Sequence, residues 1–148
     1  NIIDKIIKSH IKLKADYTSN TIIPTYPDGM DVEVFNFKAL HQSHIKAKKT
    51  DELEHVTLYI KKNRKKFILY NFFLKNGVDY SNYRLTVDYP EDLILIRKIY
   101  TKLYKNKKIF LLEEIIKFLK LNPDLIKLNS HFKRDHTLKS SIVCNKVS

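Results

Sequence analysis

A strand pattern gives way to a helix start within residues 83–92, which read Tyr83-Arg84-Leu85-Thr86-Val87-Asp88-Tyr89-Pro90-Glu91-Asp92. Branched and aromatic residues predict a strand over 83–87, and Pro90 among acidic residues predicts the first turn of a helix that reaches about Lys105. The same alternation of strands and helices recurs outward in both directions. The sequence therefore predicts an α/β fold.

Before this stretch, strands are expected at 16–20, 31–37 and 67–74, and helices at 1–14, 38–49 and 52–62. The helix at 52–62 is expected to bury Leu53, Val56, Leu58 and Ile60, and the aromatic residues of 67–74 predict a strand buried on both faces. Two turns are predicted, a stiff one at Pro27-Asp28-Gly29 and another at Asn76-Gly77.

After it, a helix is expected at 112–121 and a last turn at 124–128. One domain is predicted over residues 1–142, followed by a polar tail at 143–148. The length of 148 residues and the hydrophobic fraction of 43% fit a folded domain rather than a disordered chain.

No apolar run approaches the ~20 residues of a membrane-spanning helix, and no secretory signal pattern is visible, so no membrane partner is expected. A single cysteine, Cys144, excludes a disulfide framework and a cysteine metal cluster. A reducing compartment, the cytoplasm, fits this cysteine usage best.

The chain is strongly basic, with 28 Lys and Arg against 16 Asp and Glu and a net charge of +12. This balance raises nucleic acid or another polyanion as a partner. The basic residues include only four arginines, and the lysines scatter along whole helices. The pattern therefore favours a solvated lysine-rich surface over a nucleic-acid interface.

The chain begins with Asn1 inside a helical pattern, and its only methionine is Met30. A complete protein rarely begins at its first residue with a helix that already has isoleucines, here Ile2, Ile3 and Ile6, on one side. We therefore expect the chain to be part of a longer protein.

Asp31 and Glu33 are the first candidate site residues. Alternation along a strand places them on one face, about 6.5–7 Å apart. Two such carboxylates repel unless they face water, a cation or hydrogen-bond donors such as sugar hydroxyls. The alternative is the ordinary solvent face of an edge strand, which the spacing alone favours.

Asp88 is the second candidate, because it stands where the predicted strand ends and the helix begins. Ligands of α/β proteins bind at such points, and a carboxylate there can hold Mg²⁺. The alternative is structural: Asp88 and Glu91 have the spacing of a capping box, with Pro90 in the first turn. The two roles are compatible.

Other common catalytic patterns are missing from the sequence. His41 and His44 lie one helical turn apart without a third ligand, so they are interpreted as surface residues. No nucleophile motif occurs, and two glycines cannot build a glycine-rich phosphate loop. The role of His55 stays open.

Three segments together resemble one family: Asp16-Tyr17-Thr18-Ser19-Asn20, Tyr26-Pro27-Asp28-Gly29-Met30-Asp31-Val32-Glu33-Val34-Phe35, and Arg84-Leu85-Thr86-Val87-Asp88-Tyr89-Pro90-Glu91-Asp92. In this order, with Glu54-His55-Val56-Thr57 between the last two, they resemble the C-terminal half of cytidylyltransferases of the spore coat polysaccharide and CMP-sugar synthetase type. The resemblance covers about Asn1 to Ile142.

The resemblance implies a three-layer α/β/α nucleotidyltransferase fold, of which this chain would form the C-terminal half only. The N-terminal half of the family carries the CTP-binding loop and one Mg²⁺-binding aspartate, and the opening helix of this chain resembles the helix that follows that aspartate. The chain alone is therefore expected to be inactive.

By the same resemblance, Asp88 would be the second Mg²⁺ ligand, and Asp31 and Glu33 would accept hydrogen bonds from sugar hydroxyls. Asn20, Asp28 and Arg84 would make further substrate contacts. The implied reaction transfers CMP from CTP to a sugar or sugar acid for surface polysaccharide synthesis. A homodimer is also implied, because the family often dimerises through this half.

Two other functions stay open on the sequence. One is a non-catalytic basic module that binds nucleic acid or an acidic polymer. The other is a degenerate or split-gene remnant without activity. The identity of the sugar does not follow from the sequence.

Overall fold

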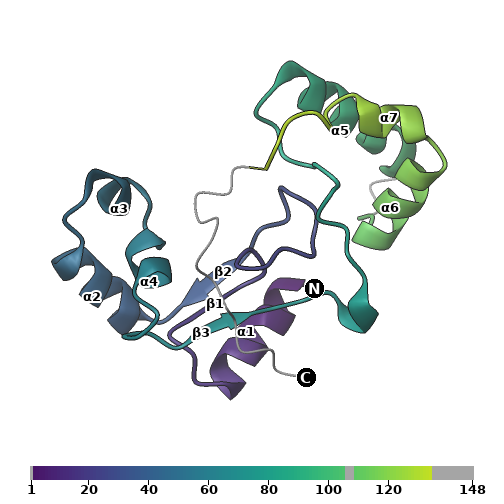
Figure 1. Ribbon diagram of the computed structural model, residues 1–148. Coiled ribbons are helices and arrows are strands. Elements are labelled where there is room, and N and C mark those ends of the chain that lie inside the picture. The colour runs from purple at the N-terminus through teal and green to yellow at the C-terminus, as the bar shows by residue number, and fades with distance from the viewer. Residues whose placement is uncertain (1, 106–108, 135–148) are drawn as a thin grey trace. The chain divides into compact units, whose positions relative to one another are not determined.

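The computed structural model describes residues 2–105 and 109–134, which form two compact units. The first unit contains residues 2–25 and 31–77, and the second contains residues 26–30 and 78–134. The predicted polar tail and the boundary at residue 142 lie outside the described residues. Figure 1 labels the elements along the chain.

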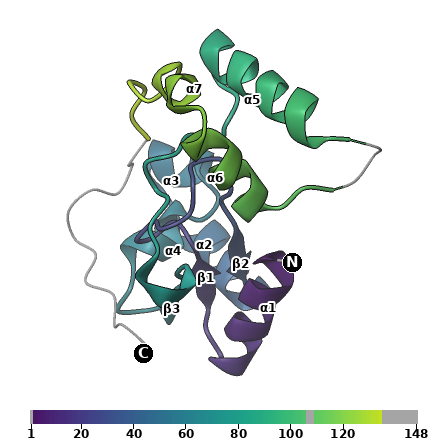
Figure 2. The same cartoon turned by 90° about the vertical axis from the view of Figure 1, so that its right-hand side faces the viewer.

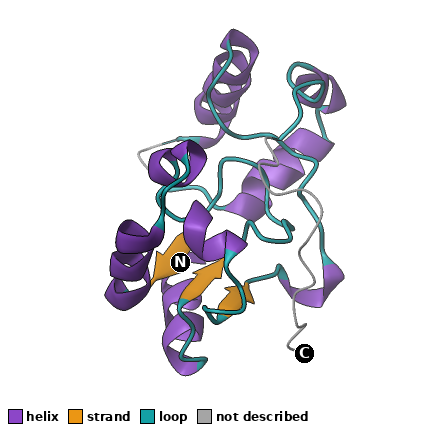
Figure 3. Cartoon of the chain, turned by 60° about the vertical axis from the view of Figure 1, so that its left-hand side comes forward, coloured by secondary structure: helices purple, strands orange, loops and turns teal. Residues whose placement is uncertain are grey.

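The first unit is built on a small mixed sheet of β1 (Tyr17–Ser19), β2 (Glu33–Phe35) and β3 (Leu69–Asn71), in the order β2-β1-β3. Strand β1 pairs with β2 antiparallel and with β3 parallel (Figure 3). The helix α1 (Ile2–Lys12) packs against β1 and β2 (Figure 2). Of its isoleucine stripe, Ile6 is fully buried, whereas Ile3, Ile7 and Ile11 are exposed.

Three helices complete this unit, α2 (Phe37–Lys46), α3 (Thr50–Glu54) and α4 (Leu58–Lys62). Asn36 begins α2, because its side-chain oxygen accepts the Ala39 amide at 2.7 Å. The continuous helix predicted over 52–62 is wrong. The chain leaves the helix at His55 and re-enters it at Leu58, so Leu53 and Val56 are exposed.

The core of the first unit consists of Tyr17, Ala39, Tyr59, Ile60 and Phe67. Strands β2 and β3 are shorter than predicted, and the residues of β3 are half-buried rather than fully buried on both faces. After β3, the predicted turn at Asn76-Gly77 is confirmed, within a 3-10 turn over Lys75–Gly77 in which both residues have positive φ.

The second unit contains α5 (Pro90–Leu103), α6 (Leu112–Lys120) and α7 (Pro123–Lys127) (Figure 2). Leu95, Ile99 and Leu119 form its core. The predicted strand over 83–87 is wrong: the backbone there makes only an isolated parallel bridge between Asp28 and Arg84. Residues 83–87 favour a strand, but they pair only with the short turn at Pro27-Asp28-Gly29, which is too short to form a continuous β-ladder with them.

These elements confirm the predicted α/β class with a small mixed sheet. The three-layer arrangement stays a prediction. Within the described part of the chain, no helix is long and apolar enough to cross a membrane.

Candidate functional site

In the second unit, Arg84 holds three aspartates together. Its Nε donates to Asp92 Oδ1 at 3.0 Å, its Nη1 to Asp28 Oδ2 at 3.1 Å, and its Nη2 to Asp88 Oδ2 at 2.7 Å. We call these four residues the arginine hub. The Arg84 side chain is only 8% exposed, and a buried cation requires such partners to replace water. The hydrogen bonds with Asp92 contribute most to raising the pKa of Arg84 above its ordinary value.

Asp92 is the fully buried member of the arginine hub. Its Oδ2 accepts from Arg84 Nη2 at 2.9 Å and from the amides of Asp88 and Tyr89 at 3.1 Å each. Burial by itself would raise the pKa of Asp92, but the hydrogen bonds, first those from Arg84, outweigh burial and hold this pKa far below its usual range. Asp92 is therefore ionised at neutral pH in the folded chain.

The predicted capping box of Asp88 and Glu91 is wrong. The helix α5 begins at Pro90, so Tyr89 is the N-cap and the third helical position falls on Asp92. The Asp92 carboxylate instead accepts hydrogen bonds from the amides of Asp88 and Tyr89, which precede the helix.

Asn129 completes the burial of this carboxylate. Its Nδ2 donates to Asp92 Oδ1 at 2.8 Å and to the Arg84 carbonyl at 3.0 Å. Sequence reasoning missed Asn129, since an isolated asparagine in a helical tail carries no motif. Only the position of its segment next to residue 84 makes it part of the site.

The turn at Pro27-Asp28-Gly29 packs against the arginine hub. The Asp28 amide donates to the Tyr83 carbonyl at 2.9 Å, and the Leu85 amide donates to the Asp28 carbonyl at 2.8 Å. Gly29 has a φ of 91°, and a Cβ there would lie 2.6 Å from the Leu85 carbonyl carbon. The turn can approach residue 85 this closely only because residue 29 has no side chain.

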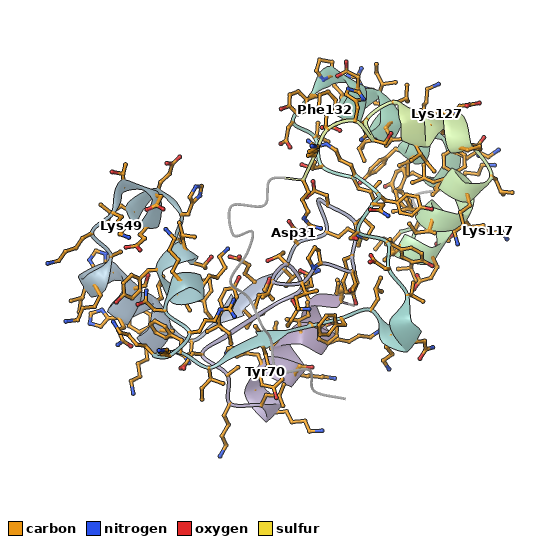
Figure 4. All side chains as sticks on the ribbon, viewed as in Figure 1. Asp31, Lys49, Tyr70, Lys117, Lys127 and Phe132 are labelled. Atoms are coloured by element: carbon orange, nitrogen blue, oxygen red, sulfur yellow. The ribbon has the colours of Figure 1, made fainter. Side chains whose placement is uncertain are left out.

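Three further side chains of the same unit support the arginine hub. Arg134 places its Nε 3.5 Å from Asp28 Oδ1, so Asp28 faces two guanidinium groups. The rings of Tyr89 and Phe132 stack at 4.0 Å, and the Arg84 Cζ lies 5.5 and 5.7 Å from their centroids. Phe132 is labelled in Figure 4, and sequence reasoning missed both Phe132 and Arg134.

Asp88 differs from the other carboxylates of the arginine hub because its side chain is 62% exposed. Its Oδ2 accepts from Arg84 and, at 3.2 Å, from the Thr86 hydroxyl. Three carboxylates face two guanidinium groups here, so the cluster carries one surplus negative charge. The exposed Asp88 presents that charge to solvent.

In the first unit, Glu33 binds hydroxyls of its own chain. Its Oε1 accepts from the Tyr17 hydroxyl at 2.6 Å and from Lys61 Nζ at 3.1 Å, and its Oε2 accepts from the Thr57 hydroxyl at 2.9 Å. We call these four residues the Glu33 network. Burial would raise the pKa of Glu33, but the hydrogen bond from Tyr17 and the charge of Lys61 lower it below the ordinary value.

Asn20 directly follows β1, and Asp31 lies shortly before β2. Asn20 is fully buried, and its Oδ1 accepts the Val32 amide at 2.8 Å. Asp31 is exposed and precedes the strand, which begins at Glu33 (Figure 4). The strand predicted from Asp31 is therefore too long, and the prediction that Asp31 and Glu33 share one face stays untested.

The structure thus brings Asp28, Arg84 and Asp88 together in one unit and places Asn20, Asp31 and Glu33 in the other. Over residues 2–105 and 109–134, no three or more His, Cys, Asp or Glu side chains form a group that could hold a metal ion. A carboxylate such as Asp88 fits Mg²⁺ chemically, but it can supply only one protein ligand. His41, His44 and His55 are exposed.

The fold defines the class of this protein. The structure of the chain is similar to that of a cytidylyltransferase from Leptospira borgpetersenii serovar Hardjo-bovis, with a TM-score of 0.77 and 25% sequence identity. The similarity covers 91% of this chain and 55% of that one. An α/β chain with this arrangement therefore has a cytidylyltransferase fold.

Sequence comparison finds two curated relatives. The chain is 32% identical to the spore coat polysaccharide biosynthesis protein SpsF of Bacillus subtilis over 124 residues, 83% of this chain and 50% of SpsF. It is 31% identical to an uncharacterized protein of Methanocaldococcus jannaschii over 137 residues, 90% of this chain and 53% of that protein. No protein-family profile matches the sequence.

These similarities confirm the resemblance to the cytidylyltransferases: the chain is related to them. The chain spans about half the length of the curated relatives it matches.

Proposed function

We propose that this chain is the sugar-side, C-terminal part of a cytidylyltransferase that transfers CMP from CTP to a sugar or sugar acid for surface polysaccharide synthesis. The relationship to SpsF and to a cytidylyltransferase structure supports the reaction class. The observation that carries the proposal is the exposed Asp88 carboxylate, held by Arg84 at the start of α5.

In this proposal, Asp88 is one ligand of Mg²⁺. The cation prefers charged carboxylate oxygens, and the surplus negative charge of the arginine hub, counted together with Arg134, favours its approach to Asp88. When bound, Mg²⁺ neutralises charge on the phosphates of CTP and orients them for attack by a sugar oxygen. The contribution of this chain is to hold the Asp88 carboxylate in place before the substrates arrive.

Asp31 is the carboxylate that we propose for hydrogen bonds to sugar hydroxyls, because its side chain is exposed. Direct contacts of Asn20, Asp28, Glu33 and Arg84 with the substrate stay predictions. The polar atoms of these four residues already bind groups of this chain, which supports a role in fixing the backbone around the site.

The proposed partners are CTP and a sugar or sugar acid, in a homodimer located in the cytoplasm. One assay tests the reaction: release of pyrophosphate from CTP with Mg²⁺ and glucuronate, galacturonate or N-acetylneuraminate. The complete protein encoded by the gene is expected to release pyrophosphate with a suitable sugar, and these 148 residues alone are expected to release none. Turnover by the isolated chain would show that an additional CTP-binding half is unnecessary and would contradict the proposal.

A further inference from the structure

We propose that Asp92 is a positioning residue, which fixes Arg84 so that Arg84 in turn fixes the carboxylate of Asp88. This inference rests on the proposed function of Asp88. It assigns to the second aspartate of the segment Asp88-Tyr89-Pro90-Glu91-Asp92 a role that its helix-capping position does not by itself require.

The first step is the hold of Asp92 on Arg84. Asp92 accepts hydrogen bonds from Arg84 Nε at 3.0 Å and from Arg84 Nη2 at 2.9 Å. One edge of the planar guanidinium group therefore binds both carboxylate oxygens. Asn129 and two backbone amides bind the same carboxylate and prevent its rotation. A bidentate pair fixes both the position and the plane of a guanidinium group.

The second step is the hold of Arg84 on Asp88. The same Nη2 that donates to Asp92 at 2.9 Å donates to Asp88 Oδ2 at 2.7 Å. The two bonds use the two hydrogens of one nitrogen, whose directions are set by the guanidinium plane. A rotation of Arg84 away from Asp92 would therefore also move its donor away from Asp88.

The aromatic rings of Tyr89 and Phe132 restrict Arg84 from another side, at 5.5 and 5.7 Å from its Cζ. Asp28 accepts a hydrogen bond from the remaining guanidinium nitrogen, Nη1, at 3.1 Å. Asp88 is the partner with an exposed side chain, so it is the carboxylate that this rigid assembly presents to a ligand. To cap α5, Asp92 needs only one oxygen that accepts hydrogen bonds from backbone amides. To orient Asp88 through Arg84, Asp92 needs its negative charge and both of its oxygens.

Asp92→Asn separates these roles, because an amide still accepts from a backbone N–H but cannot accept a bidentate arginine. In the complete protein, we expect this change to lower kcat about 10- to 100-fold, as for groups that orient metal ligands, with little change in the KM for CTP. Glu91→Gln is the matched control: it removes one negative charge from the same helical turn, outside the arginine hub, and is expected to leave kcat unchanged.

A double-mutant cycle identifies the route of the effect. If Asp92 acts through Asp88, adding Asp92→Asn to Asp88→Asn should lower kcat by no more than about twofold further. Independent, multiplying losses would show that Asp92 does not act through Asp88, and a normal kcat in Asp92→Asn would equally overturn the inference. If wild-type complete protein releases no pyrophosphate with any sugar, the proposed function itself fails, and the inference with it.

A second measurement does not depend on activity. In ¹⁵N NMR spectra, we expect separate, slowly exchanging Nη signals for Arg84 in the wild type and in Glu91→Gln, and averaged signals in Asp92→Asn. If Asp92→Asn does not fold, Arg84→Lys replaces it, since lysine keeps the charge but loses the fork. A normal kcat in Arg84→Lys would then contradict the proposal.

Discussion

The hydroxyl of Tyr17 donates a 2.6 Å hydrogen bond to Oε1 of Glu33 and so joins β1 to β2. Tyr17 is fully buried, and burial followed by the negative charge of Glu33 raises the pKa of its hydroxyl. The hydroxyl therefore stays protonated and stays a donor. Thr57 and Lys61 extend the same bond into α4, so one carboxylate connects the sheet to a helix.

Glu33→Gln is expected to reduce the acid sensitivity of the fold. The pKa of Glu33 is lowered in the folded chain, so the unfolded chain binds more protons just below the ordinary value of 4.5. The stabilisation by Glu33 is therefore complete above this pH and is lost as the pH falls through the folded pKa. Thermal unfolding from pH 7 to 3 should show a smaller loss of Tm in the variant. Glu54→Gln, at an exposed position of α3, is the control and should follow the wild type.

His10→Gln is expected to change the pH dependence of stability at higher pH than Glu33→Gln does. His10 is buried, its Nδ1 lies 3.0 Å from the Thr18 hydroxyl, and burial lowers its pKa although Asp16 opposes the shift. Below the ordinary value of 6.5, the unfolded chain takes up a proton that the folded chain resists, so stability falls as the pH decreases. The variant should lose this dependence below pH 6.5. An unchanged slope, equal to that of His44→Gln, would contradict the prediction.

Gly29→Ala is expected to destabilise the second unit by more than Gly77→Ala destabilises the first. Both glycines have positive φ, 91° and 70°, so both changes carry the strain of that conformation, about 1 kcal/mol or more. Only at Gly29 does the new Cβ also meet backbone atoms of Leu85 and Thr86, at 2.6 Å. Denaturant unfolding of both variants measures the difference, and equal losses would show that the close approach is absent in solution.

Asp88→Asn and Asp88→Ala are expected to affect catalysis rather than folding. Because Asp92 caps α5, neither change removes a cap, and the buried Arg84 keeps its hydrogen bonds to Asp28 and Asp92. In the complete protein, loss of the anionic ligand should lower kcat about 100-fold, or about 2.7 kcal/mol. Turnover of both variants is measured at saturating Mg²⁺, and wild-type rates would reject the ligand role.

Binding to duplex DNA tests the alternative of a basic nucleic-acid module. If the lysines only solvate the surface, binding should be weak at about 50 mM salt and absent at about 200 mM. Sub-micromolar affinity that persists at the higher salt concentration would favour the nucleic-acid function over the enzymatic one.

Much of the second unit follows from local sequence. Pro90 with acidic residues behind it predicts the start of α5, and the periodicity of 112–121 predicts α6, within one residue of Leu112–Lys120. The break between α3 and α4 was not predictable, because the period of Leu53 and Val56 is helical while tertiary packing takes only Leu58 and Ile60 into the core. The residues of 83–87 also favour a strand, and only the lack of a long pairing partner keeps them out of a sheet.

The sequence by itself determined the fold class, the turn at Pro27-Asp28-Gly29 and the position of Asp88 at the start of a helix, because these depend on neighbouring residues. Tertiary structure decided which carboxylates are available to a ligand. Glu33 is taken up by Tyr17, Thr57 and Lys61, and Asp92 by Arg84 and by Asn129, which is 37 residues away in sequence. Burial makes an unpaired charge too costly, so the fully buried carboxylate of Asp92 is bound by the donors that the fold brings to it, whereas the carboxylate of Asp88, paired with Arg84, remains 62% exposed.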